Sequence, residues 1–172
     1  MKSRDIAALF DFNYWANGQL LKTITAANLS DDHWVAPGTF TYRGLRATLV
    51  FILDVESSWR KRLQGLPAAV WDTSLDEGDF PSLQPLADRW RDDEREMRDW
   101  LASLTDADLA ATMDLGDGDS FPLWYYLVHI VTHSDQQRRD VQLLLRSQGI
   151  EPPDLEFLYY ADQLVSGGVG SD

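Results

Sequence analysis

The clearest chemical signal in this chain of 172 residues is a pair of histidines one helical turn apart. His129 and His133 lie in a stretch with the apolar spacing of a long helix, so their imidazole rings project from the same side. Two imidazoles on one face can share a cation, and zinc accepts neutral imidazole nitrogen as a ligand. The spacing therefore indicates half of a metal site.

The remaining ligands of such a site must come from elsewhere in the chain, because a catalytic zinc normally has three protein ligands and an open position. His33 is the only other histidine, and it sits in an acidic turn far along the chain. A carboxylate from the second long helix, Asp54 or Glu56, could complete the site. The local pattern also fits a buried, hydrogen-bonded His129 with His133 at the edge of a pocket.

The elements that would position these residues are helical. Four segments repeat apolar residues at steps of three and four, which predicts long helices over about 3–27, 42–63, 83–104 and 122–147. The one strand-like signal is Asp117-Gly118, which suits a tight turn in a very short hairpin. We therefore expect an all-α fold, an antiparallel four-helix bundle of one domain over residues 1–164, with a flexible tail at 165–172.

The charge of the chain limits its partners. Its 28 acidic and 15 basic residues give a net charge of -13, so its surface repels nucleic-acid backbones and anionic lipid, and we expect neither as a partner. One charged group in the last long helix is expected to form surface ion pairs: Asp135, Arg138, Arg139 and Asp140.

The composition also bears on compartment and assembly. The absence of cysteine excludes disulfides and thiolate ligands and fits a reducing cytoplasm. No signal peptide or membrane-length apolar run is evident, so a cytoplasmic protein is expected. Seven tryptophans are more than one small core readily hides, which favours a homodimer.

Three stretches of the chain carry a family resemblance. They are FDFNYWANGQLL at 10–21, GLRATLVFILDVESSWRKRLQG at 44–65, and LVHIVTHSDQQRRDVQLLLRSQGIEPPDLEFLYY at 127–160. In this order they resemble the DinB (DinB/YfiT-like) family: an opening helix with Trp-Ala-Asn, a second helix with an acidic residue before a Trp, and a histidine-rich helix. The resemblance implies a four-helix bundle that holds a divalent metal, often nickel or zinc, with one histidine from the second helix and two from the fourth.

Carried over position by position, the metal site that the resemblance implies is incomplete in this chain. The second-helix ligand falls on Phe51, and the fourth-helix ligands fall on His133 and Gln137. His129 occupies a further position where the family often has histidine. Phenylalanine cannot coordinate a metal, and a glutamine oxygen is a weak, neutral ligand. The candidate metal residues are thus His129, His133 and Gln137, with zinc or nickel as the implied cofactor.

Two functions follow from this pattern, since no phosphate-binding loop or nucleophile motif names a reaction. The first is a stress-associated DinB-like protein with a degenerate metal site, which binds a small ligand without catalysis. The alternative is a metal-dependent enzyme, such as a thiol S-transferase or a hydrolase, with a shifted site at His129 and His133. Phe51 and Gln137 favour the first function, and the two histidines favour the second. A small molecule or low-molecular-weight thiol is the expected ligand in either case.

Overall fold

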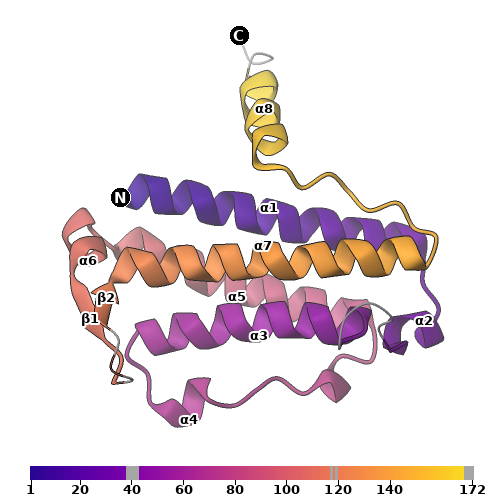
Figure 1. Ribbon diagram of the computed structural model, residues 1–172, viewed down its shortest axis with the longest axis horizontal. Helices are drawn as coiled ribbons and strands as arrows, with labels where there is room; N and C mark the ends of the chain where they lie inside the picture. Colours follow the sequence, from indigo (N-terminus) through magenta and orange to yellow (C-terminus); the bar gives the residue numbers. More distant parts are fainter. Residues whose placement is uncertain (38–42, 117, 119, 169–172) are drawn as a thin grey trace.

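Four long helices build the molecule. The computed structural model describes residues 1–37, 43–116, 118 and 120–168. The long helices are α1 (Ser3–Ala27), α3 (Leu45–Leu63), α5 (Leu83–Ser103) and α7 (Leu123–Ser147), and they pack side by side (Figure 1). The all-α four-helix prediction is confirmed.

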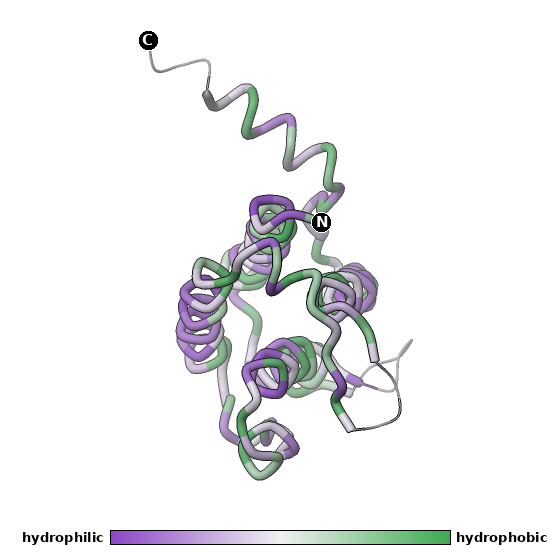
Figure 2. The backbone as a smooth tube through the Cα atoms, turned by 90° about the vertical axis from the view of Figure 1, so that its left-hand side faces the viewer, coloured by the Kyte–Doolittle hydropathy of each residue, from purple (hydrophilic) through white to green (hydrophobic). Residues whose placement is uncertain are grey.

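The helices do not simply alternate in direction. Helix α3 runs antiparallel to α7, and α1 runs antiparallel to α5, as the sequence predicts for neighbouring helices (Figure 1). The other neighbouring pairs, α1 with α7 and α3 with α5, run parallel. The cause is the connection at residues 64–82, which crosses the length of the bundle before α5 begins. Figure 2 shows the same four helices end-on.

Short elements lie in the connections between the long helices (Figure 1). They are α2 (Asp31–Val35), α4 (Ala68–Trp71), the 3-10 turn η1 (Glu77–Asp79) and α6 (Asp106–Ala110). The segment at 66–82, which the sequence predicts to be a loop, therefore contains two short helical turns. Gly65 and Gly149 follow α3 and α7 with positive φ angles of 75° and 76°, as expected for glycine at a helix C-terminus.

The predicted hairpin is present. Strand β1 (Thr112–Asp114) pairs antiparallel with β2 (Ser120–Pro122), and Met113 lies opposite Phe121. Asp117 of the predicted turn lies outside the described residues, whereas Gly118 takes a φ of 93°. Helix α7 begins directly after this hairpin, so the hairpin fixes where the histidine-bearing helix starts.

The last described element leaves the bundle. Helix α8 (Phe157–Gly168) starts beside α1 and points away from the other helices (Figure 1). The rings of Phe157 and Tyr160 pack against Phe12 of α1, with centroids 5.1 Å and 5.7 Å away. Residues 165–168, expected in a flexible tail, form the end of this helix, and residues 169–172 lie outside the described part of the chain.

The core has two apolar clusters with a polar layer between them. One cluster surrounds Leu49 and Leu86 near the α2 end, and the other surrounds Met97 and Leu127 near the α6 end. Buried polar side chains occupy the middle of the four long helices: Asn13, Asn17, Glu56, Asp93, Ser134 and Arg138. Within the described residues, no helix is long and apolar enough to cross a membrane.

Candidate functional site

The two histidines lie together on the side of α7 that faces α3. The ring of His129 meets Trp59, and the ring of His133 meets Phe51, each with centroids 5.2 Å apart in an edge-to-face arrangement. The two imidazole centroids are 6.1 Å apart. The helical spacing therefore brings the pair to one face as predicted, and residues of α3 form the opposite wall.

The two histidines differ in their surroundings. His129 is exposed, so the interpretation of it as a buried core histidine is wrong. His133 is half-buried, and its Nδ1 is shielded from solvent without a hydrogen-bond partner among the described residues. Burial lowers the pKa of His133, and the charges of His129 and Arg43 lower it further. His133 is therefore neutral at pH 7 and keeps one nitrogen ready to accept a hydrogen bond.

Phe51 places an aromatic ring between a cation and an imidazole. The guanidinium carbon of Arg43 lies 3.8 Å from the centroid of the Phe51 ring, in a cation–π contact. The same ring meets His133 edge-to-face. At the position where the family resemblance expects a metal ligand, this chain thus supplies a ring without a lone pair and a positive charge above it.

Neither carboxylate considered for the third ligand joins the histidines. Asp54 accepts a hydrogen bond from the backbone N–H of Leu75 at 2.9 Å, and Glu56 is buried in the core. Within the described residues, no group of three or more His, Cys, Asp or Glu side chains could hold a metal ion. The expectation that Asp54 or Glu56 completes the site is therefore wrong. Gln137 lies half-buried one turn beyond His133, and its role as a ligand stays a prediction.

Glu56 instead anchors the polar layer in the core. Its Oε1 accepts hydrogen bonds from Asn13 at 2.7 Å, Asn17 at 3.2 Å and Ser134 at 2.7 Å, and its Oε2 accepts one from Trp90 at 3.0 Å. Burial raises the pKa of Glu56, and the hydrogen bonds, that from Asn13 foremost, act against the rise. These contacts join all four long helices around one carboxyl group.

Arg138 completes the polar layer from the other side of the two asparagines. Its Nη1 donates to Asn13 Oδ1 at 2.6 Å and to Asn17 Oδ1 at 2.9 Å, and the side chain is 1% exposed. The expectation that Arg138 forms a surface ion pair is wrong in the main, although its Nη2 lies 3.8 Å from Asp135. In the sequence, Arg138 follows Ser134 by four positions, so the two share one face of α7. That this face points into the core becomes visible only when the packing of the four helices is known.

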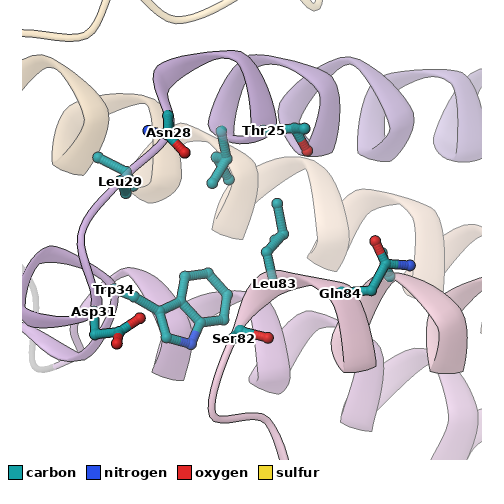
Figure 3. A pocket seen from close by; sticks show the side chains of 10 residues that line it. Thr25, Asn28, Leu29, Asp31, Trp34, Ser82, Leu83 and Gln84 are labelled. Carbon is teal, nitrogen blue, oxygen red and sulfur yellow. The ribbon is translucent and has the colours of Figure 1, made fainter.

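Among the described residues, two of the cavities bear on these elements, and no histidine lines either of them. The first, of about 260 Å³, lies where α1 ends and α5 begins (Figure 3). Trp34, Leu83, Ser82 and Asp31 are among its lining residues, and no histidine or basic side chain lines it. This cavity therefore has no part in the chemistry of the histidine pair.

The second cavity, also of about 260 Å³, lies on the α4 side of α3. Its lining includes Asp54, Trp59, Arg62 and Trp71. Trp59 also contacts His129, so this ring separates the cavity from the histidine pair. This second cavity is therefore next to the candidate site, on the opposite side of the Trp59 ring from His129.

The bundle and its connections define an all-α protein with a four-helix core and a candidate site between α3 and α7. The chain belongs to the DinB family, whose model matches residues 1–164. No curated protein matches the chain.

The residues at the positions that the family resemblance assigns do not fit a transition metal. His133 offers one imidazole, Phe51 offers no lone pair, and Gln137 offers a weak neutral oxygen. Arg43 adds a positive charge on the Phe51 ring. A divalent cation would meet too few donors and a like charge at this face.

Proposed function

We propose that this DinB family protein binds a small molecule at the face of α3 and α7 and does not use the metal chemistry of its family there. The observation that carries the proposal is the buried Nδ1 of His133 beside Phe51, which has no hydrogen-bond partner in the described part of the chain. A shielded polar atom without a partner costs free energy, which a hydrogen bond from a bound molecule would recover. A stress-associated role belongs to the same proposal.

The walls of this face favour a particular kind of ligand. The neutral imidazole of His133 can accept a hydrogen bond, and Phe51 offers an aromatic ring beside it. Trp59 offers a second ring beside His129. Sulfur makes favourable contacts with aromatic rings, and a thiol is a weak donor that a neutral imidazole can accept. A low-molecular-weight thiol is therefore the ligand class that these side chains suit best.

A metal-dependent enzyme is the second candidate function, and one observation favours it. The imidazoles of His129 and His133 lie on one side of α7 with centroids 6.1 Å apart, a spacing that a shared ion could bridge. In that case the pair, with Gln137, would hold zinc or nickel in a thiol S-transferase or a hydrolase.

Ligand-observed saturation-transfer NMR tests the proposal with N-acetylcysteine as probe and N-acetylserine as its matched control without sulfur. We expect transfer to the thiol probe in the wild type, weaker transfer to the serine probe, and loss of both in His133→Ala. Equal transfer to the two probes, or transfer that His133→Ala leaves unchanged, would contradict a thiol site at this face. Calorimetric titration with zinc and nickel separates the second candidate: stoichiometric binding that His133→Ala abolishes would favour the enzyme and overturn our proposal.

A further inference from the structure

Arg43 brings a permanent charge to the Phe51 ring of the α3 and α7 face. Its guanidinium stays protonated at any physiological pH. It stacks 3.8 Å above the ring whose edge meets His133, so a fixed positive charge lies one aromatic ring away from the imidazole. Burial is the main cause of the lowered pKa of His133, and the charges of His129 and then Arg43 act in the same direction.

The backbone holds Arg43 in this place. The next residue, Gly44, is the N-cap of α3, and a Cβ added to it would lie 2.0 Å from the carbonyl oxygen of Ala36. Only a residue without a side chain permits this approach, so the backbone of Ala36, just after α2, packs directly against the start of α3. A close backbone contact thus lies directly beside Arg43, and the guanidinium itself stacks on Phe51.

We propose that Arg43 is a specificity-determining residue: its guanidinium is a built-in cation that keeps divalent metal ions away from His133 and leaves the face to neutral or anionic ligands. This inference rests on the proposed function, in which the face binds a molecule other than a metal ion. Unit and double positive charges within several ångströms repel each other, and at the effective dielectric of a protein surface we expect this to weaken ion binding by about tenfold or more.

The charge of Arg43 should also affect attempts to restore a metal site. If Phe51 and Gln137 were the only obstacles, restoring imidazoles at these positions would restore a metal site. With Arg43 in place, an added imidazole still shares the face with a guanidinium. Metal affinity should then recover fully only when the charge of Arg43 is also removed.

The test measures zinc affinity by calorimetry in the Gln137→His variant, which adds an imidazole one turn beyond His133 and leaves Phe51 intact. We expect Gln137→His to bind zinc weakly and the Gln137→His, Arg43→Gln double variant to bind it at least about tenfold more tightly. Arg46→Gln in the same background is the matched control. Arg46 stands at the same end of α3 and lies 3.5 Å from Glu77, whereas Arg43 stacks on the Phe51 ring, so Arg46→Gln should change zinc affinity much less.

Equal zinc affinity with and without Arg43, or an equal gain from Arg46→Gln, would overturn the role of Arg43. A second background, Gln137→His with Phe51→His, repeats the comparison after the ring itself is removed, and circular dichroism checks that each variant folds. The two proposals fail separately. Stoichiometric zinc in the wild type would overturn the proposed function, whereas a wild type without zinc and no gain from Arg43→Gln would overturn only the further inference.

Discussion

At the scale of single residues, the core of this protein depends on a few polar side chains that compensate one another. Glu56 and Arg138 are both buried, and the amides of Asn13 and Asn17 lie between them, donating to the carboxylate and accepting from the guanidinium. The N–H groups of each amide thus face Glu56, and its oxygen faces Arg138. Removing one charge would leave the other buried without compensation, which is more costly than the net value of the intact pair.

Arg138→Met should therefore lower the free energy of unfolding by about 3 kcal/mol or more. The methionine fills a similar volume, so the loss reports the uncompensated Glu56 more than a cavity. Urea denaturation followed by circular dichroism measures it. Arg139→Met is the matched control, because Arg139 is 71% exposed on the same helix and should cost less than about 0.5 kcal/mol. Equal losses in the two variants would show that the polar layer does not depend on Arg138.

The pH dependence of stability should reveal His133. Its pKa is lowered in the folded protein, chiefly by burial, so below pH 6.5 the unfolded chain binds a proton that the folded protein does not. The stability of the wild type should then fall, relative to His133→Gln, as the pH drops through 6.5 toward the folded pKa. Urea denaturation of both proteins, above and below that window, gives the difference. A gap between the two proteins that is constant with pH would contradict the lowered pKa.

At the scale of elements, apolar side chains that recur at the helical step were enough to predict the four long helices, and glycines mark the ends of α3 and α7. The turn residues predicted the hairpin. The parallel pairing of α3 with α5 could not be predicted, since nothing in residues 64–82 shows that they cross the bundle. The burial of Glu56 in the core could not be predicted either. A polar residue in a helix resembles a surface residue until the register of its neighbours is known.

Only part of the candidate site could be predicted, because helical spacing places residues on a face but does not show their neighbours. The spacing of His129 and His133 fixes their common side of α7, but not what faces them. Arg43 lies outside the helices, next to Gly44, and its guanidinium stacks on Phe51 of α3. Such a contact between a loop and a helix leaves no periodic signal in the sequence.

Two glycine substitutions test how the helices are positioned. Gly44→Ala should lower the free energy of unfolding by about 1 to 3 kcal/mol, because its Cβ would lie 2.0 Å from the backbone oxygen of Ala36. Gly18→Ala, within α1, meets nothing within 4 Å and should raise stability by about 0.5 to 1 kcal/mol. Thermal and urea denaturation measure both changes. A stabilising effect of Gly44→Ala would contradict the packing of α2 against the start of α3.

At the scale of the whole molecule, α8 is the element whose apolar surface the bundle does not cover. Leu158 is 78% exposed and Val165 is 70% exposed, on a helix that points away from α1 (Figure 1). Large exposed apolar residues on one helix are typical of a contact with another chain. We propose that a second copy covers them in a homodimer.

Sedimentation tests this assembly directly. We expect a dimer at tens of micromolar for the wild type and a monomer for Leu158→Asp with Val165→Asp, because charged groups would then have to be buried in the contact. Ala102→Asp with Ser103→Asp is the control for the added charge. Both positions are exposed and lie near the end of α5. A wild type that sediments as a monomer, or a dimer that persists with both α8 substitutions, would exclude α8 as the contact.

The α3 and α7 face carries the proposed function, and the metal content of the purified wild type tests its chemistry. We predict far less than one zinc or nickel ion per chain, and the same low content in His133→Ala, because Phe51 gives no lone pair and Arg43 adds a like charge. Mass spectrometry of the native protein and elemental analysis measure it together. One tightly held ion per chain that is lost in His133→Ala would contradict the proposed function and identify the histidine pair as a metal centre.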